Sequence, residues 1–78
     1  MIVKYFARFR EVTGTERETI EIGDGCRVSD VLDIIRRKHP MMDNERNILT
    51  AINEKYAGPE DAVSDGDELA VLPQVSGG

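Results

Sequence analysis

The chain ends on Gly77-Gly78, directly after the extended-looking run 71–76. Two residues without side chains can pass through a slot too narrow for any other residue, so the C-terminal carboxylate is the first candidate for chemistry. An α-carboxyl group has a pKa of roughly 3.5 and is therefore an ionised, unreactive electrophile at neutral pH. Chemistry at Gly78 would need activation by another protein. The alternative is an ordinary chain end without a chemical role.

Other reactive side chains are few and isolated. The single cysteine, Cys26, has no partner for a disulfide or a zinc ligand pair, and we interpret it as a turn or edge residue. His39 lies among basic residues and is predicted to be a solvated cation at a helix end. Asp65 and Asp67 flank a glycine and are typical of a turn. With neither a phosphate-binding glycine loop nor a metal-ligand spacing, the sequence predicts no bound metal and no bound cofactor.

The length and net charge of the chain exclude further classes of function. A chain of 78 residues forms one domain with little room for a built-in active site. Its net charge of -5 has the wrong sign for neutralising nucleic-acid phosphates and favours a basic protein partner. No apolar run approaches the roughly 20 residues that span a bilayer. These features predict a cytoplasmic protein that binds neither membrane nor nucleic acid.

Two alternating segments predict an N-terminal β-hairpin. Residues 2–9 are rich in aromatic and β-branched side chains, with Val3, Tyr5, Ala7 and Phe9 on one face. Residues 13–15 supply a turn, and residues 18–22 alternate again.

A helix follows, and then more strands. Ser29 or Asp30 can cap its N-terminus, and Pro40 ends it. Its buried stripe has the i, i+3, i+4, i+7 spacing and consists of Val28, Val31, Leu32 and Ile35. Residues 41–47 are predicted to form a loop, and strands are expected at 48–52, 55–57 and 68–72. The order predicts an α+β fold of the β-grasp type, a mixed sheet of four or five strands with one main helix on one face. The domain would span 1–72, followed by a flexible tail at 73–78.

Several segments together resemble one family, the ubiquitin-like sulfur carriers of the MoaD/ThiS type, and in particular the MoaD-type small subunit of molybdopterin synthase. The resemblance covers essentially the whole chain in order. It is carried by 5–11 (Tyr-Phe-Ala-Arg-Phe-Arg-Glu) with Gly14, by Val31 and Leu32, by 51–53, by 65–70, and by 73–78 (Pro-Gln-Val-Ser-Gly-Gly). Gln74 and Leu72 depart from the proline and the aromatic residue that family members often have there.

The resemblance implies which reactions take place at Gly78 and which partners carry them out. Gly78, preceded by Gly77, would be adenylated by a partner related to ubiquitin-activating enzymes, which uses ATP. A sulfur donor would then convert it to a thiocarboxylate. The large subunit of molybdopterin synthase would catalyse sulfur transfer to the pterin precursor, so this chain would be a non-catalytic carrier subunit.

Strand parity predicts where partners bind. If Val3 and Tyr5 face the helix, Phe6 points to the opposite face, where Leu72 should be its neighbour and Tyr56 should lie at the edge. Arg8 and Arg10 are candidates for charge pairing at the rim. The remaining predicted contacts line the path to the reactive end, at Pro73, Val75 and Ser76.

Three other functions compete with this hypothesis. A sulfur carrier of the thiazole branch of thiamine synthesis shares the fold and the glycines, but lacks the opening pattern matched here by Phe6, Ala7, Arg10 and Glu11. A ubiquitin-like protein modifier of the archaeal type would join the activated Gly78 to lysines. A plain β-grasp interaction module would have incidental glycines.

Overall fold

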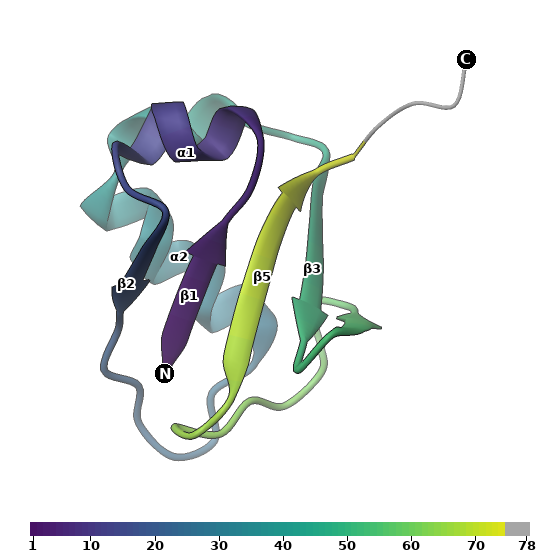
Figure 1. Cartoon of the computed structure of the whole chain (residues 1–78). Helices are drawn as coiled ribbons and strands as arrows, with labels where there is room; N and C mark the ends of the chain where they lie inside the picture. The colour runs from purple at the N-terminus through teal and green to yellow at the C-terminus, as the bar shows by residue number, and fades with distance from the viewer. Residues whose placement is uncertain (75–78) are drawn as a thin grey trace.

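The computed structural model describes residues 1–74, and its elements follow one another from the N-terminus as shown in Figure 1. In chain order they are β1 (Ile2–Tyr5), α1 (Arg8–Thr13), β2 (Arg17–Thr19), α2 (Val28–Lys38), the 3-10 helix η1 (Pro40–Asn44), β3 (Ile48–Ile52), β4 (Lys55–Ala57) and β5 (Glu68–Pro73). Within these residues, no helix has the length and apolar character needed to cross a membrane.

The strands form one mixed sheet in the order β2-β1-β5-β3-β4. The first and last strands run parallel at its centre, with Val3 opposite Leu69 and Tyr5 opposite Val71. The other three pairings are antiparallel. The predicted β-grasp architecture is confirmed, and the strands expected at 48–52 and 55–57 are found with those bounds.

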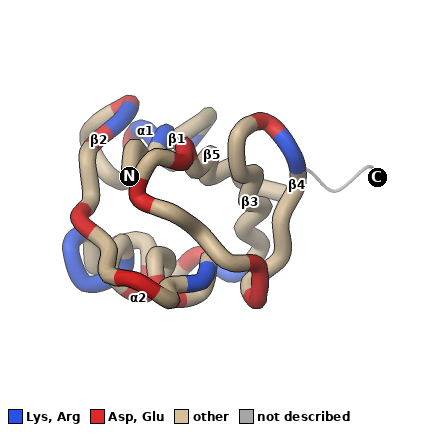
Figure 2. The backbone as a smooth tube through the Cα atoms, turned by 90° about the horizontal axis from the view of Figure 1, so that it is seen from below, with Lys and Arg blue, Asp and Glu red and all other residues tan. Residues whose placement is uncertain are grey.

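Helix α2 covers one face of the sheet, and the hydrophobic core lies between the two layers. In Figure 2, which looks from below, α2 lies on one side of the strands. Its buried residues Val28, Val31 and Ile35 belong to the same core cluster as the strand residues that alternate toward them. Those strand residues are Val3, Tyr5, Leu69 and Val71. The opposite face of the sheet has no helix over it in residues 1–74.

The long first strand is the main error of the sequence prediction. Strand β1 stops at Tyr5, and residues 8–13 form α1 instead. The chain turns at Ala7, which has φ 52° and ψ -134°. Phe9 reaches the core from α1, so its burial does not depend on strand parity. Strands β1 and β2 do pair antiparallel, but α1 joins them in place of a tight hairpin turn. Ile20 is buried, although it lies just beyond β2.

Two smaller expectations concern the ends of α2. The expected cap at Asp30 is confirmed, because its carboxylate accepts a hydrogen bond of 2.9 Å from the N–H of Arg27, the residue that precedes the helix start at Val28. The segment predicted as a loop contains η1, because Met42 is fully buried in the core. Burial of the Met42 side chain stabilises this short helix against the core.

Candidate functional site

The candidate reactive end leaves the sheet at the C-terminus of β5. Pro73 lies opposite Ile48, and Leu72 lies opposite Leu49. The backbone N–H of Gln74 then donates a hydrogen bond of 2.8 Å to the carbonyl oxygen of Asn47. The predicted site residues Val75, Ser76, Gly77 and Gly78 lie outside the described residues. The structure therefore defines where the chain leaves the sheet, after Gln74.

An apolar surface lies beside this point on the sheet face that α2 does not cover. We call it the outer patch and define it as Phe6, Leu49, Tyr56, Ala70 and Leu72. The register places Tyr56 opposite Ala51, Ala51 opposite Ala70, and Leu49 opposite Leu72, so the side chains of these strand residues share one face. Phe6 follows the end of β1 and is hydrogen-bonded to Val71 of β5 through its backbone. Phe6 is 41% exposed and Tyr56 is 80% exposed, whereas Leu49, Ala70 and Leu72 are half-buried. Two of the predicted partner-binding residues, Leu72 and Tyr56, thus share one face of the sheet, and the exposed Phe6 lies next to β5.

The backbone at Phe6 is fixed although its side chain is exposed. Its N–H donates to the carbonyl oxygen of Val71 at 3.1 Å, and its carbonyl oxygen accepts from the N–H of Phe9 at 3.1 Å. The first bond ties Phe6 to β5 and the second ties it to α1. A backbone held in this way loses little conformational freedom when a partner covers the residue.

The two predicted rim arginines are both paired within the chain. The guanidinium group of Arg8 lies 2.8 Å from the carboxylate of Glu45 and 5.3 Å from the ring centroid of Phe9. Arg10 lies 3.4 Å from Glu16. Exposed pairs of this kind contribute less than about 1 kcal/mol each, so both arginines can exchange partners at little cost.

A polar cluster that the sequence analysis missed lies at the end of α2, around Glu18. The Glu18 carboxylate accepts a hydrogen bond of 2.6 Å from Tyr5, lies 2.6 Å from His39 Nε2, and lies 2.7 Å from Lys38 Nζ. The side chains of Glu18 and His39 are only 14% and 18% exposed. The prediction of a solvated His39 is therefore wrong. These four residues come from three separate elements or their ends, and no local sequence pattern links them.

The electrostatics of this cluster indicate a structural role. Burial by itself would raise the pKa of Glu18, but hydrogen bonds from Lys38, Tyr5 and His39 outweigh it and lower that pKa to about 2. Burial, together with the hydrogen bond to Glu18, raises the pKa of Tyr5 far above its ordinary value. Both groups keep fixed protonation states near neutral pH. The cluster therefore joins β1 and β2 to the end of α2.

The comparisons with known proteins bear on the chain as a whole. A family model described as the ThiS family matches residues 3–78. The chain belongs to the ThiS family.

The similar proteins share both its sequence and its fold. The molybdopterin synthase sulfur carrier subunit of Chlamydomonas reinhardtii is 43% identical over 79 residues, covering 97% of this chain and 95% of that protein. A putative molybdopterin converting factor, subunit 1, from Pyrococcus furiosus superposes with a TM-score of 0.89 at 34% identity, covering 95% of each chain. SAMP1 from Haloferax volcanii gives a TM-score of 0.88 at 31% identity, covering 100% of this chain and 98% of the other. The predicted family is confirmed.

Proposed function

We propose that this ThiS-family chain is the sulfur carrier subunit of molybdopterin synthase, and that Gly78 bears the sulfur as a thiocarboxylate. The observation that carries the proposal is the 43% identity to a molybdopterin synthase sulfur carrier subunit over nearly the full length of both chains. A carrier subunit of a synthase implies a second subunit. We assign catalysis to that large subunit, because the described residues offer no perturbed acid or base beside the point where the chain leaves β5.

The chemistry at Gly78 requires two partners in succession. A carboxylate oxygen of Gly78 attacks the α-phosphorus of ATP on an adenylyltransferase, and pyrophosphate leaves. Hydrosulfide released by a donor protein then attacks the acyl carbon, AMP leaves, and loss of the sulfur-bound proton gives the thiocarboxylate. A terminal Gly77-Gly78 suits both steps, since a side chain at either position would widen the segment that must enter each partner. The protein is expected to act in the cytoplasm, where these partners would meet it.

The outer patch is the docking surface in this proposal. It borders the C-terminal end of β5, so a partner that covers Phe6 and Leu72 also receives the departing chain. Pro73 continues the strand for one residue, and Val75 and Ser76 follow toward Gly77. Arg8 and Arg10 lie close to Phe6 in the sequence and supply exposed positive charge for the rim of the contact. The mixture of an apolar centre and a charged rim is typical of protein interfaces.

The mass of the intact protein tests the proposal. The chain is produced together with its adenylyltransferase and a sulfur donor, and exchange of oxygen for sulfur should raise its mass by about 16 Da. Deletion of Gly78 should abolish the gain, as should one extra residue after it. Extended protein that supports dithiolene formation without being trimmed would refute the proposed role of Gly78.

A second candidate function is protein modification through the same glycine. The similarity to SAMP1, with a TM-score of 0.88, favours it, because solved structures of that protein are described as small archaeal modifier protein 1. A modifier would give larger species in which Gly78 is joined to lysine side chains of other proteins. Peptide mass spectrometry after proteolysis would detect the branched linkage, and its absence from active cells would leave the carrier function alone.

A further inference from the structure

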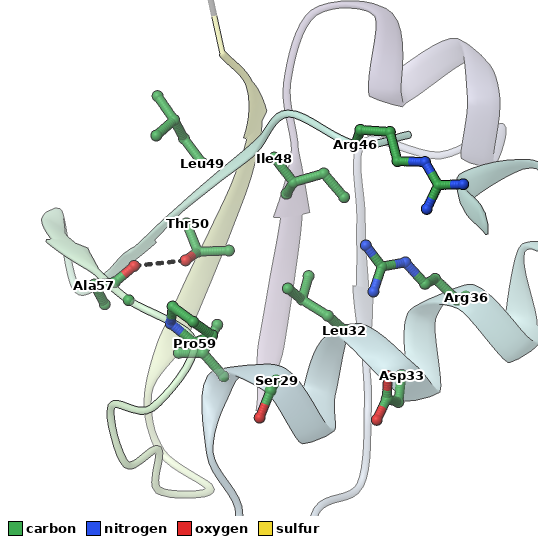
Figure 3. Close-up of a pocket in the computed structure, with 12 residues that line it drawn as sticks. Ser29, Leu32, Asp33, Arg36, Arg46, Ile48, Leu49, Thr50, Ala57 and Pro59 are labelled. Atoms are coloured by element: carbon green, nitrogen blue, oxygen red, sulfur yellow. Dashed lines mark hydrogen bonds between the residues drawn. The ribbon is translucent and has the colours of Figure 1, made fainter. Parts of the chain in front are cut away.

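A groove of about 440 Å³ lies between α2 and β3, on the helix-covered side of the sheet, and Leu49 of the outer patch lies at its border. Figure 3 shows Leu32 of α2 and Ile48 of β3 pointing toward each other across it, with Pro59 at one end. Leu32 and Ile48 are only half-buried, although Leu32 belongs to the same helical stripe as the fully buried Val31 and Ile35. The floor of the groove is therefore apolar and incompletely covered.

The groove runs along a stretch of β3 whose outer edge is open. The N–H of Gln74 donates to the carbonyl oxygen of Asn47, so the peptide groups of Asn47 point toward β5. Because successive residues of a strand point their peptide groups to opposite edges, those of Ile48 point away from β5. On that edge of β3, Lys55 of β4 pairs with Ile52 and Ala57 pairs with Thr50. Strand β4 ends at Ala57. Continuing the register would place Pro59 opposite Ile48, and proline has no N–H to donate. In residues 1–74, no strand pairs with Ile48 on this side.

Two arginines converge at the other end of the groove. The guanidinium groups of Arg36 on α2 and Arg46 before β3 point toward one another in Figure 3. Among the described residues neither forms a salt bridge, which is also true of Arg17 and Arg37, whereas Arg8, Arg10 and Arg27 do form one. Asp33 also lines the groove but points away from the two arginines. Adjacent like charges favour an added anion, and arginine is well suited to a carboxylate.

We propose that this groove binds an extended acidic-apolar segment of a partner protein. The segment adds as a strand to the open edge of β3 and pairs with the peptide groups of Ile48. Its apolar side chain packs on Leu32 and Ile48, and its carboxylate binds Arg36 and Arg46. The proposal goes beyond sulfur transfer, because the apolar floor of the groove at Leu32 and Ile48 lies on the helix-covered side of the sheet, and of the outer patch only Leu49 borders the groove.

The occupant is a partner rather than the chain's own C-terminus or a second copy. Gln74 lies on the β5 side of β3, whereas the open peptide groups of Ile48 are on the other side. A second copy would bring a net charge of -5 against another -5, which opposes close approach. A short acidic segment brings negative charge only where the two arginines lie.

The probe is a capped synthetic hexapeptide with the sequence Thr-Val-Thr-Val-Glu-Glu, titrated into the full-length, isotope-labelled protein. We expect amide chemical-shift changes centred on Leu32, Ile48 and Ala57. A double variant, Arg36→Gln with Arg46→Gln, should weaken binding at least about tenfold, as expected when charge-assisted hydrogen bonds are lost. The matched control is Arg37→Gln, which removes an exposed arginine of the same helix that does not line the groove, and it should bind as the parent does.

A second peptide with glutamine in place of both glutamates separates charge recognition from strand addition. It should bind the parent and the double variant equally, and weakly. Absence of binding by the acidic peptide, or shifts centred on Phe6 and Leu72, would overturn the proposal. So would movement of the amide signals of residues 76–78 on Arg46→Gln substitution without peptide, which would place the chain's own end in the groove. Self-association that depends on Arg46 would assign the groove to a second copy and would also overturn it.

Discussion

The backbone N–H of Gln74 lies 2.8 Å from the carbonyl oxygen of Asn47, one residue beyond the end of β5. Sheet pairing therefore continues to the last described residue. We expect the Gln74 amide to exchange at least about tenfold more slowly than an unstructured amide of the same sequence, because exchange requires local opening of the pair. Hydrogen exchange followed by NMR measures this directly. Exchange at the unprotected rate would place the end of the sheet before Gln74.

The two phenylalanines provide a matched test of which side chains stabilise the fold and which serve a partner. Phe9 is fully buried, whereas Phe6 is 41% exposed. Phe9→Ala should lower the free energy of unfolding by about 3–5 kcal/mol. Phe6→Ala should cost less than about 1.5 kcal/mol, yet weaken binding of the large synthase subunit by about 1–3 kcal/mol. Chemical denaturation and calorimetry on the same variants check both values. A large loss of stability with unchanged affinity would remove Phe6 from the docking surface.

The two ends of α1 give opposite predictions for glycine. Ala7 has φ 52° and Gly14 has φ 77°, both in the region that favours glycine. Ala7→Gly should raise the free energy of unfolding by about 0.5–1 kcal/mol, because relief of strain exceeds the entropy of the added freedom. Gly14→Ala should lower it by about 1 kcal/mol, although an added Cβ meets no atom within 4 Å. A fall in melting temperature for Ala7→Gly would contradict the first expectation.

Stability at acid pH should depend on Glu18. Its folded pKa is about 2 and its ordinary value is 4.5, so the carboxylate contributes fully above about pH 4.5. The contribution is lost as the pH falls from there toward 2, since protonation is then favoured in the unfolded chain first. At neutral pH this difference of about 2.5 pKa units corresponds to roughly 3 kcal/mol.

The matched control for that pH dependence is a neighbouring exposed glutamate. Denaturation midpoints measured between pH 2 and pH 6 should show a shallower dependence for Glu18→Gln than for the parent protein. Glu16→Gln removes only an exposed carboxylate 3.4 Å from Arg10 and should follow the parent curve. Parallel curves for Glu18→Gln and the parent would show that the cluster with Lys38, Tyr5 and His39 does not hold Glu18 ionised.

Sequence periodicity predicted the elements whose burial follows one simple repeat. Val28, Val31 and Ile35 mark α2, and Leu69 and Val71 mark β5. It failed at residues 6–13, because Phe9 fits the strand alternation of Val3 and Tyr5 as well as it fits a helix. The i, i+3 spacing of Phe9 and Val12 before Gly14 was the signal for α1, and it is weak over such a short segment.

Other features depend on tertiary contacts that no local pattern records. Met41 is exposed and Met42 is buried, although they are adjacent and identical in type. Glu18 and His39 are 21 residues apart and meet only because β2 packs beside the end of α2. The outer patch could be predicted from strand parity for Phe6 and Leu72, but the open edge at Ile48 depends on where β4 stops.

The central position of β5 makes folding of the sheet depend on synthesis of the last strand. Because the last strand lies between β1 and β3, the sheet cannot close until a ribosome has synthesised and released almost the whole chain. Products that terminate early lack the middle of the sheet and expose apolar strand edges, which makes them targets for proteolysis. A folded domain therefore indicates that synthesis has passed Pro73, five residues before Gly78. Partners that recognise the folded sheet would then seldom engage a chain that ends before Pro73.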